Sequence, residues 1–146
     1  MSSAGENLRV NGDRLWDSLM EMAQIGPGVA GGNNRQTLTD EDGEGRALTP
    51  EAAHALGVLG GLEIVRTLKD LGIRTKHPIV VTNWTNEEGT RFAPAMLASG
   101  VFAGVHEQAW AEDRTDAEGK RFGDELDRIG WRGAEEVGAR RMHAFF

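Results

Sequence analysis

The chain has 146 residues, a length typical of one domain, and its 16 basic and 23 acidic side chains give a formal net charge of −7. An acidic chain without a cluster of Lys and Arg predicts no nucleic-acid partner and no binding to an anionic membrane. No run of 18 apolar residues is present, so no transmembrane helix is expected. The N-terminus has no apolar core of the signal-peptide type, and the expected compartment is the cytoplasm.

Cysteine is absent, which excludes disulfides, thiolate zinc sites and cysteine nucleophiles. Carboxylate and imidazole groups are therefore the side chains that would hold any metal ion. The four imidazoles belong to His54, His77, His106 and His143.

An amphipathic helix is predicted over residues 11–25, with Asn11 as its N-cap and Gly26 as its stop. Its apolar face is formed by Leu15, Leu19 and Met22, which follow the i, i+4, i+7 spacing. The polar, glycine-rich residues 26–46 predict a long loop, and loops of that length in compact domains are usually functional or disordered.

A second helix is predicted from Pro50 to Leu71, with Thr49 as N-cap and Gly72 as the C′ residue. Leucine and valine recur along it at three-residue spacing. The helix also contains Gly57, Gly60 and Gly61. Each glycine costs a helix about 1 kcal/mol relative to alanine, so close packing against another backbone is expected there.

Residues 79–81 form an unbroken apolar run, Ile-Val-Val, which predicts a strand buried on both faces of a sheet. Short helices are predicted over residues 93–100 and 121–129, and another strand near the end of the chain, in "RRMHAFF". A helix, a short turn and a buried strand make half of a βαβ unit, so the predicted fold class is α/β.

The stretch "TNWTNEEGTRF" places Glu87 and Glu88 directly after the predicted strand. Ligand sites in open α/β sheets lie beyond the carboxyl ends of the strands. One carboxylate of such a pair can coordinate a cation while its neighbour moves a proton, with Gly89 allowing a tight turn. The alternative is a solvated surface turn that carries two like charges, and the dipeptide alone leaves both interpretations open.

The segments "GVLGGLEIVRTLKDLG" and "HPIVVTNWTNEEGTRFAPAMLASGVFAG" closely resemble N-carbamoyl-L-amino-acid amidohydrolases. That family includes allantoate amidohydrolases and β-ureidopropionases, within the zinc-dependent aminoacylase and carboxypeptidase superfamily. The resemblance extends over nearly every residue, including "NLRVNGDRLWDSLMEMAQIG" and "DELDRIGWRGAEEVGARRMHAFF". It implies a zinc-peptidase-like catalytic domain, with a mixed sheet and flanking helices.

By the same resemblance, Glu87 matches the general base that activates a metal-bound water, and Glu88 matches a metal ligand. The family's reaction cleaves the C–N bond of N-carbamoyl-L-amino acids, or of related ureido acids, to the free amino acid, carbon dioxide and ammonia. The implied cofactor is a divalent metal (zinc, manganese, cobalt or nickel), and the complete family member is expected to be a homodimer. No residue is assigned to substrate binding.

Parts of the family pattern are missing. The strand carrying the "GSHxDT" histidine is absent, and Ala53 occupies the place of the metal-bridging aspartate of "GGxFDG". The family continues beyond Phe146 through "ELHIEQG" and a lid or dimerisation domain. Residues 1–146 are therefore expected to be a partial catalytic domain with several strands missing, which binds metal weakly and is inactive alone.

None of the four histidines is expected to replace the missing ligands. The alternative function is a non-catalytic remnant that acts as a binding or oligomer-forming module, because lost strands would expose apolar edges that favour association.

Overall fold

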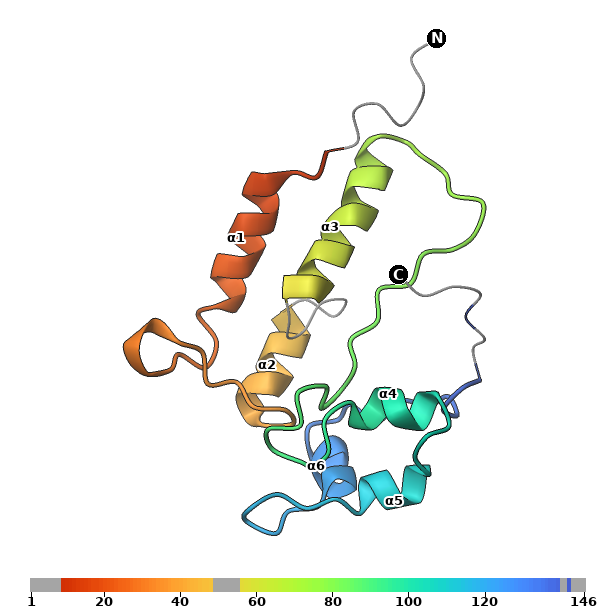
Figure 1. The fold of residues 1–146 in the computed structure, drawn as a ribbon. Coiled ribbons are helices and arrows are strands. Elements are labelled where there is room, and N and C mark those ends of the chain that lie inside the picture. The colour runs from red at the N-terminus through yellow and green to blue at the C-terminus, as the bar shows by residue number, and fades with distance from the viewer. Residues whose placement is uncertain (1–8, 49–55, 140–141, 143–146) are drawn as a thin grey trace. The chain divides into compact units, whose positions relative to one another are not determined.

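The computed structural model describes residues 9–48, 56–139 and 142. The described residues form helices joined by loops (Figure 1), and none of these helices is long and apolar enough to cross a membrane. The elements are α1 (Gly12–Met22), the 3-10 turn η1 (Val29–Gly31), α2 (Asp40–Leu48), α3 (Leu56–Asp70), α4 (Leu97–Phe102), α5 (Gln108–Glu112) and α6 (Phe122–Arg128). The chain divides into a first unit, Met1–Arg35 with Glu44–Asn83, and a second unit, Gln36–Gly43 with Trp84–Phe146.

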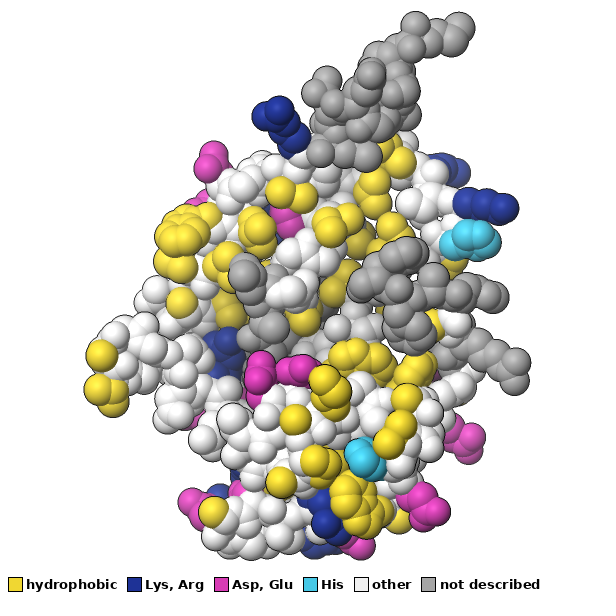
Figure 2. Space-filling model, in the orientation of Figure 1, with side chains coloured by type: hydrophobic (Ala, Val, Ile, Leu, Met, Phe, Trp, Pro, Cys, Tyr) yellow, Lys and Arg dark blue, Asp and Glu magenta, His cyan; other side chains and the backbone are white. Residues whose placement is uncertain are grey.

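In the first unit, α1 packs along α3 (Figure 1). The predicted first helix is confirmed, and its N-cap is Asn11, whose side-chain oxygen accepts a hydrogen bond of 3.0 Å from the Arg14 backbone N–H. The buried side chains between the two helices are Met22, Ile25, Leu59 and Leu62. Hydrophobic side chains also remain at the surface over α1 and α3 (Figure 2), where Trp16 is 61% exposed.

A fully buried carboxylate, Glu63, joins the start of α1 to α3. Arg14 donates to both of its oxygens, at 2.8 and 2.7 Å, and the Asn11 N–H donates at 3.1 Å. The hydroxyl of Thr67 donates a fourth hydrogen bond, at 3.2 Å. The hydrogen bonds from Arg14 are the main reason that the pKa of Glu63 lies below its usual value. Glu63 is therefore a structural, fully hydrogen-bonded carboxylate rather than a free acid.

The end of α3 follows the prediction for Gly72. This glycine has a φ of 65°, and its N–H donates to the Lys69 carbonyl at 3.0 Å. The Ile73 N–H donates to the Leu68 carbonyl at 2.9 Å, which completes a Schellman motif. The predicted start of this helix, at Thr49 and Pro50, lies outside the described residues.

The packing expected at the helix glycines is found at Gly61 alone among the three. A Cβ added there would lie 3.2 Å from a methyl group of Val81. At Gly57 and Gly60, an added Cβ would meet no described atom within 4 Å. The expected packing against a backbone is therefore not found at these three glycines, and only Gly61 lies close to another segment, at the side chain of Val81.

The predicted buried strand is wrong in its burial and is not confirmed as part of a sheet. Residues 78–83 follow α3 without regular secondary structure, and they pair with no strand in the described part of the chain. Ile79 and Val80 are 50% and 54% exposed. A strand needs a neighbour to satisfy its N–H and C=O groups, and the described residues hold only two isolated bridges, Pro27 with Asn33 and Thr115 with Arg121. The expected mixed sheet is accordingly not confirmed.

The long loop predicted over residues 26–46 is wrong in its second half, which forms α2. The Thr39 hydroxyl accepts a hydrogen bond of 3.3 Å from the Asp42 N–H, and the Asp42 carboxylate accepts one of 2.7 Å from the Leu38 N–H. The first turn is acidic, with Asp40, Glu41 and Asp42, as the helix dipole favours. These capping hydrogen bonds and the acidic first turn outweigh the low helix propensity of the two glycines in α2.

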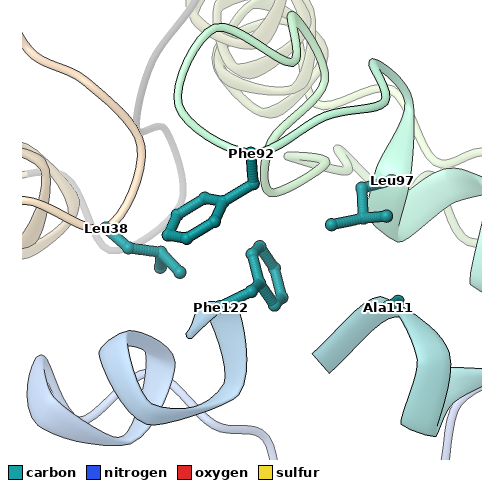
Figure 3. Close-up of a cluster of buried hydrophobic side chains, with 5 residues drawn as sticks. All are labelled: Leu38, Phe92, Leu97, Ala111 and Phe122. Atoms are coloured by element: carbon teal, nitrogen blue, oxygen red, sulfur yellow. The ribbon is translucent and has the colours of Figure 1, made fainter. Parts of the chain in front are cut away.

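The second unit is built around a hydrophobic core of two leucines, one alanine and two phenylalanines (Figure 3). The core residues are Leu38, Phe92, Leu97, Ala111 and Phe122. The two phenylalanine rings meet edge to face, with centroids 5.3 Å apart. The core joins Leu38, from residues 36–43, to side chains of residues 84–129. It therefore fixes the segment that carries the glutamate pair.

Of the two helices predicted in this unit, the second is confirmed as α6 and the first is displaced. Residues 93–96 form a turn that includes a cis Ala93–Pro94 bond and a Met96 φ of 56°, and α4 begins only at Leu97. The short helix α5 was not predicted. The strand predicted in the final residues falls outside the described residues, apart from Met142.

Candidate functional site

Glu87 and Glu88 lie in a turn of the second unit, and both side chains are exposed. The preceding Asn86 is 2% exposed and has a left-handed backbone, with a φ of 58°. Its amide group donates to the carbonyls of Phe92, at 2.6 Å, and Pro94, at 3.3 Å. The side-chain N–H groups of Asn86 thus hold the turn from inside, although its Oδ1 atom is buried without a hydrogen-bond partner in the described part of the chain, and the two glutamate side chains are exposed.

Backbone contacts fix the same turn against the start of α4. The Met96 N–H donates to the Glu87 carbonyl at 2.6 Å, and the Leu97 N–H donates to the Asn86 carbonyl at 3.3 Å. Gly89 has a φ of 70°, and a Cβ added there would lie 2.5 Å from the Ala95 nitrogen. Only glycine fits this close approach. The backbone under the two glutamates is therefore defined on both sides.

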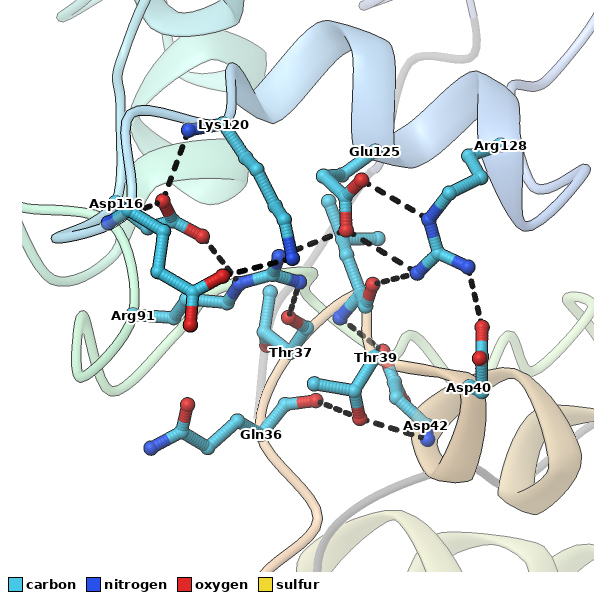
Figure 4. Close-up of polar contacts among 12 residues, drawn as sticks. Gln36, Thr37, Thr39, Asp40, Asp42, Arg91, Asp116, Lys120, Glu125 and Arg128 are labelled. Carbon is cyan, nitrogen blue, oxygen red and sulfur yellow. Dashed lines mark hydrogen bonds and ion pairs between the residues drawn. The ribbon is translucent and has the colours of Figure 1, made fainter.

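Directly after the turn, Arg91 forms the centre of a buried polar network (Figure 4). Its guanidinium donates to Asp116 at 3.0 Å, to Glu125 at 2.7 Å and to the Thr37 carbonyl at 2.9 Å. The side chains of Arg91, Asp116 and Glu125 are 7%, 7% and 9% exposed. Arg91 also lies over the Phe92 ring, 4.9 Å from its centroid. The network therefore joins Arg91, which follows the glutamate turn in the chain, to Thr37 and to the segment that holds Asp116 and Glu125.

A second arginine completes this network. Arg128 donates to Glu125 at 2.9 Å and to the Leu38 carbonyl at 2.9 Å, and it also pairs with Asp40. The hydrogen bonds from Arg128, with those from Arg91, place the pKa of Glu125 below its usual value. Burial raises the pKa of Asp116, but hydrogen bonds from backbone N–H groups and from Arg91 outweigh it, and the net pKa is lowered.

These lowered pKa values predict a loss of stability in acid. The carboxylates of Glu63, Asp116 and Glu125 have lower pKa values in the folded chain, so the unfolded chain binds more protons. Their contribution is complete above the unfolded pKa values of about 4 and is lost as the pH falls through the folded ones. We expect the urea midpoint to be flat from pH 7 to about 5 and to fall below about 4.

The matched variant for this measurement is Glu125→Gln, which removes one of the carboxylates with a lowered pKa and should give a shallower decline between pH 4 and 2. A midpoint that stays constant down to pH 2 in the unsubstituted chain would contradict the assignment of these carboxylates as stabilising ion pairs.

The residues that the structure describes do not fit a complete zinc site. Catalytic and structural zinc ions take three or four protein ligands. Within residues 9–48, 56–139 and 142, no group of three or more His, Asp or Glu side chains is placed to hold a metal ion. His106 packs on Trp110, with ring centroids 4.9 Å apart, and exposed His77 belongs to the first unit. His54 and His143 lie outside the described residues.

The chain belongs to peptidase family M20/M25/M40, whose profile matches residues 37–144. A curated relative, N-carbamoyl-L-amino-acid amidohydrolase of Rhizobium meliloti, is 60% identical over 191 positions, which cover 100% of this chain and 46% of the relative. A protein of the same name from Geobacillus stearothermophilus is 28% identical, over 83% of this chain and 40% of its own length. The chain thus spans about half the length of these relatives or less.

Solved structures agree with this assignment. An amidase of the hydantoinase/carbamoylase family from Burkholderia vietnamiensis superposes with a TM-score of 0.88 at 40% identity, covering 94% of this chain and 44% of that one. Another from Burkholderia multivorans gives 0.86 at 42% identity, covering 93% and 44%. The family resemblance, which was predicted from segments that cover nearly every residue, is confirmed.

The alignment with the Rhizobium protein also contains an internal gap. It extends over 191 positions, whereas the whole chain has 146 residues, so at least 45 positions of the relative have no counterpart here. The family pattern predicts a deletion between residues 48 and 56, and the length of the alignment agrees with a deletion without locating it.

Proposed function

We propose that this chain is part of the catalytic domain of a metal-dependent amidohydrolase that cleaves N-carbamoyl-L-amino acids to the free amino acid, carbon dioxide and ammonia. The observation that carries the proposal is the glutamate turn: two exposed carboxylates on a backbone fixed by Asn86, Gly89 and the start of α4. The name of the relative that is 60% identical across the whole chain supports the substrate class. In the complete protein, the domain would act as a homodimer.

Glu87 is the general base in this proposal. Its carboxylate takes a proton from the attacking water and returns it to the leaving nitrogen, a role that contributes about 10²- to 10⁴-fold to the rate in enzymes. Glu88 would contribute one ligand to a divalent ion, and such an ion lowers the pKa of bound water toward about 7. Because the described residues supply no three-ligand site, the other ligands would come from outside them, and this chain alone should not catalyse the reaction.

The first test uses the chain itself. Purified protein is incubated with zinc, manganese, cobalt or nickel and an N-carbamoyl-L-amino acid, and both ammonia release and bound metal are measured. We expect no turnover and less than one tightly bound ion per chain. Turnover that persists in Glu87→Gln would contradict the role given to Glu87.

The role of Glu87 is tested where the other ligands are present. In a chimera, residues 56–146 replace their counterpart in the Rhizobium amidohydrolase, and kcat is measured with the metal supplied. The chimera should hydrolyse the substrate, and Glu87→Gln should lower kcat about 10²- to 10⁴-fold with the metal still bound. Glu88→Gln should instead lower metal content. The matched control is Glu118→Gln, which changes an exposed carboxylate of the same unit and should leave kcat unchanged.

A further inference from the structure

Helices α4, α5 and α6 of the second unit border a small pocket together with residues 131–137. Its volume is about 190 Å³, and every residue that lines it belongs to the second unit. Three of the lining residues are members of the hydrophobic core drawn in Figure 3. The apolar part of the lining consists mainly of Leu97, Val101, Ala111, Phe122, Leu126 and Trp131.

The charged groups beside this pocket already bind one another. Arg132 donates to both carboxylate oxygens of Glu112, at 2.8 and 3.3 Å, and the Gln108 amide donates to the same carboxylate at 2.7 Å. The hydrogen bond from Arg132 is the main reason that the pKa of Glu112 lies below its usual value, so this carboxylate stays ionised and paired. Arg132 also donates to Asp127, at 2.5 and 3.1 Å. Glu135, the remaining charged residue of the lining, is exposed to solvent.

These contacts determine which kind of molecule the pocket favours. A charged ligand would have to compete with the ion pairs of Arg132, whereas a neutral ligand leaves them intact. Burying a charge next to Leu97 and Phe122 would also cost desolvation that no new ion pair offsets.

The volume is suited to a single aromatic ring. An apolar cavity of about 150 Å³ lined by leucine, isoleucine and phenylalanine stays dry and binds benzene. The pocket here is of similar volume and also has leucine and phenylalanine in its lining. Trp131 adds an aromatic side chain against which a ring can pack.

We propose that this pocket is a binding site for a neutral aromatic ring of the size of a benzyl group. The site borders the backbone of the glutamate turn, because the Leu97 N–H donates to the Asn86 carbonyl at 3.3 Å and Thr85, which precedes Asn86, also lines the pocket. The inference does not depend on the proposed catalytic function, because it uses neither the carboxylates of that turn nor a metal ion.

The first experiment titrates the full chain with benzyl alcohol and follows the backbone amide signals by NMR. We expect saturable shifts at lining residues of all three helices, such as Leu97, Ala111 and Leu126, with a Kd of about 1 mM. Absence of saturable shifts up to about 10 mM would overturn the proposal. Shifts confined to exposed apolar residues of the first unit, such as Trp16, would overturn it as well.

The charge preference is tested with two analogues that carry the same ring. Benzoate and benzylammonium have opposite charges, and each should bind about tenfold more weakly than benzyl alcohol because its charge must be desolvated or must displace an existing ion pair. Binding of either analogue as tight as that of benzyl alcohol would contradict the preference for a neutral ligand.

A pocket-filling variant tests the place of the site. Ala98 lines the pocket on α4, so Ala98→Leu should occupy part of the volume and weaken the binding of benzyl alcohol about tenfold. The matched control is Ala103→Leu, at the exposed C-cap of the same helix and outside the lining, which should bind like the original chain. Equal affinities of the two variants would overturn the assignment to this pocket.

A pocket-enlarging variant provides a test that does not require Ala98→Leu to fold. Val101→Ala removes two methyl groups from the lining and should leave a larger space. The affinity for 2-naphthalenemethanol relative to benzyl alcohol should then rise about tenfold over that of the original chain. An unchanged ratio would show that the ring binds elsewhere.

Discussion

Replacing Arg91 by alanine is expected to lower the unfolding free energy of the second unit by about 3–5 kcal/mol. The reason is that Arg91 is the shared cation of two buried carboxylates. Asp116 loses its ion-pair partner, Glu125 keeps only Arg128, and the carbonyl of Thr37 loses its donor. Removing one member of a buried charged network leaves the others desolvated and unpaired, which costs more than the ion pair contributes.

The measurement is urea unfolding followed by tryptophan fluorescence. Trp84, Trp110 and Trp131 all belong to the second unit, so a Trp16→Phe background removes the signal of the first unit. The matched control is Arg121→Ala, which deletes an arginine that is half-exposed and pairs with exposed Asp113 and Asp124. That variant should unfold almost as the original does. Equal midpoints for Arg91→Ala and Arg121→Ala would contradict the structural role of the network.

Local sequence signals predicted the elements that depend on local contacts. The Asn11 cap, the C′ glycine at Gly72 and the helix α6 each involve residues within one or two turns of one another. Such contacts are set by the identity of nearby side chains, so a pattern in the sequence is enough to find them. The short helix α5 has only five residues and no side-chain cap, and the sequence therefore contains little signal for it.

The strand predicted at residues 79–81 shows the opposite case. Its apolar run has the composition of a buried strand, but burial and pairing depend on neighbours that are far away in the chain. With at least 45 positions of the Rhizobium relative missing from this chain, the composition persists while Ile79 and Val80 are half-exposed. A sequence pattern shared with a relative can thus predict burial that the described residues do not provide.

The hydrogen-bond network next to the candidate site could not be predicted from the sequence. Glu87 and Glu88, which precede the turn glycine Gly89, were singled out by the family resemblance, because the dipeptide alone also fitted a surface turn, and their roles stay predictions. Arg91 stands in the same motif, but its acidic partners follow 25 and 34 residues later and its carbonyl partner precedes it by 54. No spacing rule connects residues so far apart, so only the folded chain reveals this network.

Replacing Phe92 by alanine should cost the second unit about 3–5 kcal/mol through a different mechanism. The ring is fully buried, meets Phe122 edge to face and packs in the cluster that contains Leu38, so its removal leaves a cavity in the centre of the core. The control is Val105→Ala, which truncates a side chain that is 73% exposed and should change the midpoint little.

The two variants can be distinguished by their pH dependence even if they lose the same free energy. Phe92→Ala leaves the Arg91 ion pairs in place, so its urea midpoint should still fall below pH 4 with the original slope. Arg91→Ala should show a shallower acid decline. Without Arg91, the pKa values of Asp116 and Glu125 lie closer to those of the unfolded chain, so protonation of these groups destabilises the fold less. A parallel acid decline in both variants would mean that packing alone holds residues 84–97 in place. In that case the glutamate turn would owe its geometry to the core and to Asn86, with no contribution from the buried charges behind it.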